Sequence, residues 1–209
     1  MEPYPLGSPS EPRGPERKRS LVRRGLWLEY ATLGWNVVGS VVVLAAAVLA
    51  RSVALAGFGL DSLIEIVASL VVVWQLKGVA HAREGRALRI IGVAFLLLAA
   101  YIAAQSSYVL ATGFRPHHSL AGIVWLALTV AAMFALGWGK GRTGRTLGNR
   151  VLETEARVTL VDGCLAAAVL FGLVLNATLG WWWADPLSGL VIVFYGARAG
   201  WAALQEARA

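Results

Sequence analysis

Six long apolar stretches separated by short polar segments are the feature that most constrains the fold of this chain. Each is close to the ~20 residues that an α-helix needs to cross about 30 Å of hydrocarbon. Backbone polar groups in lipid must be satisfied internally, so we predict an all-α integral membrane protein with six transmembrane helices. The predicted spans are Leu26–Ala50, Val53–Leu76, Ile90–Thr112, Ser119–Trp138, Val158–Leu179 and Trp183–Leu204.

The composition agrees with a membrane protein. Hydrophobic residues make up 57% of the chain and charged residues only 15%, whereas soluble domains are about 45–50% apolar and about 25% charged. This difference excludes an ordinary soluble domain and a disordered chain. A single cysteine, Cys164, excludes an intrachain disulfide framework and a cysteine-rich metal site.

The distribution of basic residues predicts the orientation, because Lys and Arg are enriched in cytoplasmic loops. The N-terminal segment and two alternate loops hold most of them: Arg13, Arg17, Lys18, Arg19, Arg23, Arg24, then Lys77, Arg83, Arg86, Arg89, then Lys140, Arg142, Arg145, Arg150 and Arg157. The opposite loops hold only Arg51 and Arg115. We therefore expect both termini in the cytoplasm, and we ascribe the net charge of +7 to topology and not to nucleic-acid binding.

The chain divides into two parts by hydropathy. Residues 1–25 are basic and proline-rich and are predicted to be a disordered cytoplasmic tail, and residues 26–205 form the six-helix transmembrane domain. The glycine-rich segment 139–148 lacks the Gly-Lys-Ser/Thr ending of a phosphate-binding loop. We expect it to be a flexible cytoplasmic linker. No C-terminal cytoplasmic domain is expected after the sixth span.

Three acids within the spans are the strongest candidates for function, because ionisable side chains are costly in lipid. Asp61 and Glu65 lie one helical turn apart in the second span, roughly 12 and 18 Å from its outer end. This spacing places both carboxylates on one helix face, where they repel each other unless a cation or a proton lies between them. Asp162 supplies a third carboxylate from the fifth span.

A polar stripe runs along the fifth span toward Asp162. Glu155, Thr159 and Asp162 share one helix face and suggest an access route for ions from the cytoplasm. Counted from Val158, Asp162 is only ~6 Å deep, whereas Glu65 is ~17 Å from the inner end of its own span. The two depths agree only if the fifth helix begins before Val158 or if the helices tilt differently.

Simpler roles remain open for these and two other acids. The three acids could be protonated and form interhelical hydrogen bonds, which are worth about 0.6 kcal/mol on average. Asp185 precedes Pro186 and is expected to cap its own helix. Glu29 is expected to lie near the cytoplasmic membrane boundary, where its carboxylate can reach water or pair with Arg23 or Arg24.

The segment from Ser52 to Glu65 resembles the second transmembrane helix of the cation diffusion facilitator family, and the similarity continues through Asp162 and the segment from Gly180 to Leu190. The family consists of six-helix divalent-metal/proton antiporters, usually dimeric. The resemblance implies that Asp61, Glu65 and Asp162 are metal ligands. A fourth ligand position of the family falls on Val158, which cannot bind a metal. Either Thr159, Glu155, Asn36 or water completes the shell, or the substrate is not the usual one, or transport is impaired.

The resemblance implies a metal/proton antiporter that exports Mn, Fe, Zn or Co from the cytoplasm, with no resident cofactor and no enzymatic activity. Because the family's cytoplasmic domain is not expected here, a homodimer would form through the membrane helices. The partners are then a divalent metal ion and the lipid bilayer, in a cell membrane such as the bacterial inner membrane. The alternatives are a membrane scaffold that does not transport, and an organic-cation transporter that uses the same acids as counter-ions.

Overall fold

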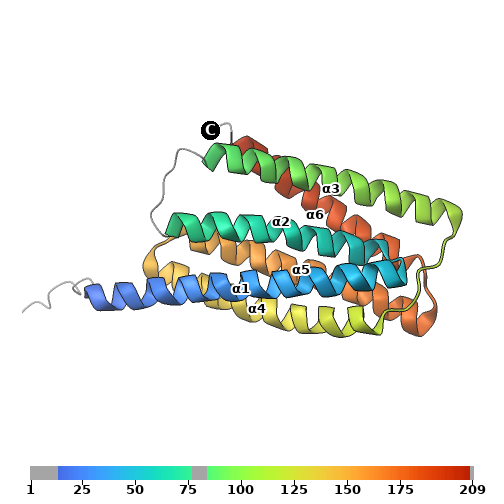
Figure 1. The fold of residues 1–209 in the computed structure, drawn as a ribbon, viewed down its shortest axis with the longest axis horizontal. Helices are drawn as coiled ribbons and strands as arrows, with labels where there is room; N and C mark the ends of the chain where they lie inside the picture. The colour runs from blue at the N-terminus through green and yellow to red at the C-terminus, as the bar shows by residue number, and fades with distance from the viewer. Residues whose placement is uncertain (1–13, 77–83, 208–209) are drawn as a thin grey trace, which may run out of the picture.

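A computed structural model describes residues 14–76 and 84–207. Within them the chain forms six α-helices that run up and down along the long axis of the molecule (Figure 1). The helices are α1 (Pro15–Ala50), α2 (Val53–Leu76), α3 (Glu84–Thr112), α4 (Leu120–Leu147), α5 (Arg150–Leu179) and α6 (Ala184–Glu206).

Local sequence signals explain several of the helix ends. The side chains of Ser119 and Asn149 accept hydrogen bonds from backbone N–H groups in the first turns of α4 and α5, and each therefore acts as an N-cap. Gly148 and Gly180 end α4 and α5 in the left-handed conformation. Arg51 adopts the same conformation, with φ 52°, where the chain turns tightly from α1 into α2.

The helices form two groups. Helices α1, α2, α4 and α5 pack into a bundle, and α3 and α6 cross each other beside it (Figure 1). The α3–α6 crossing depends on two glycines that face each other, because a Cβ atom on Gly92 would lie 2.9 Å from the carbonyl oxygen of Gly200. A buried apolar core that includes Phe58, Leu126 and Val169 fills the bundle near the α1–α2 turn.

The outer surface suits a lipid environment. Among the described residues, helices α1, α3, α4, α5 and α6 each contain a segment long and apolar enough to cross a membrane. Large apolar side chains on these helices are exposed, among them Val48, Leu97 and Phe171. The chain is thus a helical, multi-pass membrane protein.

Two predictions about the polar segments differ from the structure. Helix α1 begins at Pro15, not at Leu26, so residues 15–25 are helical, whereas residues 1–13 lie outside the described part. The expected linker at 139–148 is largely the last part of α4, and only Gly148 and Asn149 separate α4 from α5. Lys77 and Arg83, which entered the orientation argument, also lie outside the described residues.

Candidate metal centre

Three carboxylates from two helices meet inside the bundle. Asp61 and Glu65 come from α2 and Asp162 from α5, and one oxygen atom of each lies within 4.8 Å of the others. All three side chains are buried. Helix α5 starts at Arg150, so the residues before Val158 are helical and the depth difficulty raised by the sequence is removed.

The hydrogen bonding around these acids is incomplete. Asn36 of α1 donates from its side-chain amide to Glu65 Oε2 at 3.0 Å and so orients that carboxylate. Both carboxylate oxygens of Asp162 are buried without a hydrogen-bond partner. Buried polar atoms without partners are rare and costly, and a bound cation or a proton would satisfy them. The arrangement therefore has the chemistry of a cation site.

The acids line a cavity of about 420 Å³ between α2, α3, α5 and α6. Two arginines and two aromatic side chains share its wall. Among the described residues, the lining comprises Asp61, Glu65, Phe95, Arg157, Val158, Val161, Asp162, Leu165, Tyr195, Gly196, Arg198, Ala199 and Ala202. The cavity thus extends to the three acidic residues from the side of the bundle where α3 and α6 lie.

Val158 lies in this cavity wall one helical turn before Asp162 and is partly exposed. The structure thus places an apolar side chain where the family resemblance implies a fourth ligand. A metal held by Asp61, Glu65 and Asp162 would complete its shell with oxygen from water or from a neighbouring side chain.

A second buried charged group lies beside the three acids and was missed from the sequence. The Lys140 ammonium of α4 donates to Glu29 Oε2 at 3.0 Å, to Glu155 Oε1 at 3.4 Å and to Thr159 Oγ1 at 3.1 Å. Lys140 and Glu29 are completely buried. We refer to Lys140, Glu29, Glu155 and Thr159 together as the lysine cluster. Its three acceptors match the three N–H groups of an ammonium.

The sequence did contain a signal for Lys140. The buried positions Leu126, Thr129, Met133 and Gly137 of α4 follow a spacing of three and four residues, and Lys140 continues it. The basic, glycine-rich character of the segment suggested a loop and obscured this period. Glu155 and Thr159, which were predicted as extra ligands or an access route, both contact Lys140.

Two further expectations about acids were wrong. Glu29 pairs with Lys140 inside the bundle and does not lie at the boundary beside Arg23 or Arg24. Asp185 does act as a cap, but for α2 and not for its own helix. Its carboxylate accepts from the hydroxyl of Ser52 and from the backbone N–H groups of Val53 (3.0 Å) and Ala54 (3.5 Å).

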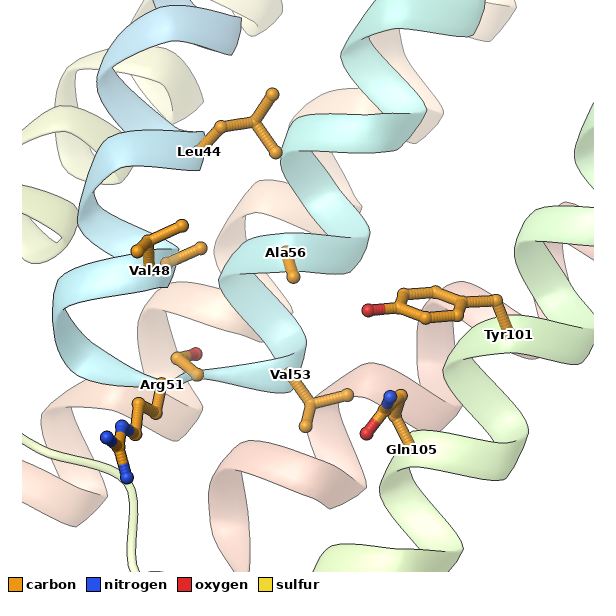
Figure 2. Close-up of a pocket in the computed structure, with 9 residues that line it drawn as sticks. Leu44, Val48, Arg51, Val53, Ala56, Tyr101 and Gln105 are labelled. Carbon is orange, nitrogen blue, oxygen red and sulfur yellow. The ribbon is translucent and has the colours of Figure 1, made fainter.

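A cavity of about 310 Å³ at the opposite end of the bundle differs in character (Figure 2). Tyr101 and Gln105 of α3 point toward α2 there, and the side chain of Arg51 points away from them. No carboxylate is among the described residues that line this cavity. Of these two cavities, only the one that contains Asp61, Glu65 and Asp162 therefore has carboxylates suited to a metal among its described lining residues.

A helical bundle with carboxylates gathered on its inner faces defines a class of membrane protein that handles cations. The family of cation efflux transmembrane domains matches residues 85–209, which is more than half of the 209-residue chain. The chain therefore belongs to this cation transporter family, and the resemblance found in the sequence is confirmed.

A relative in Xenopus laevis, transmembrane protein 163, is 25% identical over 200 residues. This alignment covers 88% of the present chain and 69% of the relative. The family match contains Asp162 but not Asp61 or Glu65, because it begins in α3.

Proposed function

We propose that this protein is a divalent metal/proton antiporter that exports metal from the cytoplasm through Asp61, Glu65 and Asp162. The supporting observation is that three buried carboxylates approach within 4.8 Å of one another on the wall of a cavity. Like charges at this distance repel strongly in a medium of low dielectric constant. A divalent cation or protons must offset this repulsion, and that requirement makes the exchange of one for the other feasible.

The proposed cycle uses the same oxygens twice. Metal binds from the cytoplasmic side and displaces protons from the three acids. Helix movement then turns the site to the exterior, where protons compete for the carboxylates and release the metal. In this scheme all six helices span the membrane, both termini are cytoplasmic, residues 26–205 form the transport domain, and a homodimer forms through the membrane helices.

The ligand set favours harder metal ions. Three carboxylates with no histidine or cysteine suit Mn²⁺ or Fe²⁺ better than they explain selectivity for zinc. Asn36 supports this oxygen-rich site by holding Glu65 in place. We therefore expect Mn²⁺ and Fe²⁺ to be transported faster than Zn²⁺ or Co²⁺.

Flux in proteoliposomes tests the proposal. Uptake of Mn²⁺, Fe²⁺, Zn²⁺ and Co²⁺ and luminal pH would be recorded under an imposed pH gradient, for the wild type, Asp61→Asn and Asp162→Asn. Glu153→Gln is the matched control, because Glu153 lies in the first turn of α5 and is absent from the acid cluster. Metal-dependent proton movement that both asparagine variants abolish and the control retains is expected. Failure of the folded wild type to move any metal would overturn the proposal.

Transport of an organic cation is the second candidate function. Phe95 and Tyr195 line the same cavity as the carboxylates, and aromatic faces attract organic cations. A tetraalkylammonium ion would then compete with Mn²⁺ for uptake. The metal antiporter predicts no such competition at concentrations that leave the pH gradient intact.

A further inference from the structure

We infer that Lys140 is a resident cation that occupies the place of a second metal ion and closes the route along Glu155 and Thr159. Metal would then reach Asp162 only through the cavity between α5 and α6. This inference rests on the proposed function, because it assigns the specificity and the access route of the same site. It corrects the access route suggested by the polar stripe in the sequence.

The contacts of Lys140 resemble those of a bound cation. Its ammonium has three oxygen partners on two other helices, Glu29 of α1 and Glu155 and Thr159 of α5. Glu29 Oε1 is buried without a hydrogen-bond partner. The carboxylates of Glu29 and Glu155 and the ammonium of Lys140 give the cluster a net formal charge of −1. A divalent ion in place of the ammonium would give a net charge of zero. Without the lysine charge, this group has the composition of a divalent-cation site.

The glycines of α4 explain why a lysine is buried here. A Cβ atom on Gly137 would lie 2.8 Å from the side chain of Leu160, and one on Gly144 would lie 3.0 Å from the backbone nitrogen of Glu153. Helices α4 and α5 therefore approach each other so closely that water does not reach the ammonium between them. The lysine tail is held inside the bundle and is not free to leave the cluster as a metal would.

Two faces of α5 meet at Asp162. Glu155 and Thr159 face Lys140, whereas Val158, Val161 and Leu165 face the cavity. At about 100° per residue, Asp162 falls between the two faces. With the first face occupied by Lys140, the second is the one by which a hydrated ion can approach Asp162.

Mn²⁺ binding to detergent-purified protein, measured from the EPR signal of free Mn²⁺, tests the resident-cation role. The wild type is expected to bind one ion per chain, Lys140→Gln two, and Lys140→Gln with Glu29→Gln one again. Lys140→Arg keeps the charge and should bind one. A monodisperse Lys140→Gln protein that binds no more Mn²⁺ than the wild type would overturn the inference. Absence of binding in the wild type would refute the proposed function, while a Glu29-dependent ion gained by Lys140→Gln would still support the lysine role.

Cysteine labelling tests the access route of the metal to Asp162. It leaves Lys140 intact, so it still tests the inference if Lys140→Gln does not fold. The only natural cysteine, Cys164, is exposed and is first replaced by serine. Val161→Cys should react with a cationic methanethiosulfonate and be protected by Mn²⁺, whereas Thr159→Cys should react at least tenfold more slowly. Equal rates at both positions, each slowed by Mn²⁺, would place the route along the polar stripe and refute the inference. The labelling rates do not require transport.

Discussion

Replacement of Asp162 by asparagine should stabilise the metal-free protein and abolish its stabilisation by Mn²⁺. Asparagine keeps the size of the side chain and its ability to hydrogen bond, but it removes one of three negative charges. Asp162 is the informative position because both of its carboxylate oxygens are buried without a partner. The hydrogen bond from Asn36 to Glu65 is not altered by the change.

The size of the effect follows from the spacing of the carboxylates. Oxygens within 4.8 Å of one another correspond to a repulsion of about 3.5 kcal/mol per ionised pair at an effective dielectric constant near 20. The variant removes two of the three pairs. Bound protons reduce the repulsion, so the relief should increase with pH. Since about 1 kcal/mol shifts the melting temperature by roughly 2–4 °C in a protein of this size, we expect a gain of at least ~2 °C at pH 8 and almost none at pH 5.

Mn²⁺ should stabilise the wild type but not the variant. A ligand at 100 times its dissociation constant stabilises the native state by about 2.7 kcal/mol, or roughly 5–10 °C for the wild type. Asp162→Asn should lose most of this shift, and Glu153→Gln should retain it. Thermal unfolding in detergent, with EDTA or Mn²⁺ at pH 5 and 8, provides the measurement. Equal destabilisation of Asp162→Asn at both pH values, with the Mn²⁺ shift retained, would show that the acids act as hydrogen-bonding groups.

Three other changes test the packing and the ligand set. Asp185→Ala should lower stability by about 2–3 kcal/mol, because the buried N–H groups that begin α2 lose their acceptor, and thermal unfolding should show a smaller loss for Asp185→Asn. Gly172→Ala should also lower the melting temperature, since a Cβ atom there would lie 2.9 Å from the carbonyl oxygen of Ala184, whereas Gly34→Ala meets no atom within 4 Å and should leave it unchanged or raised. Val158→His adds a nitrogen ligand one turn from Asp162 and should raise Zn²⁺ affinity relative to Mn²⁺ in competition titrations; an unchanged ratio would place Val158 outside the ligand shell.

The residues of the acid cluster were predictable because each signal was local. Asp61 and Glu65 lie one turn apart in an apolar span, and helix geometry alone places them on one face. Their approach to Asp162 required the packing of α2 against α5, which no local pattern specifies. Asn36 was predicted as a possible ligand, and the structure shows it bonded to Glu65.

The lysine cluster shows where local signals fail. Lys140 stands in a segment whose charge and glycine content are typical of a loop, yet those glycines let neighbouring helices approach and bury it. Asp185 has the sequence pattern of a cap, but its carboxylate reaches the start of α2 because α6 packs beside that end.

The sequence by itself determined the class of protein, because the free energy of apolar helices in lipid depends on length and composition and not on neighbours. It also determined most helix positions and the three acids, since a carboxylate in an apolar span is conspicuous wherever it occurs. Only the tertiary structure decided which charges are partners. The distance between two side chains on different helices depends on how closely the backbones pack, and small residues such as the glycines beside Lys140 on α4 set that distance.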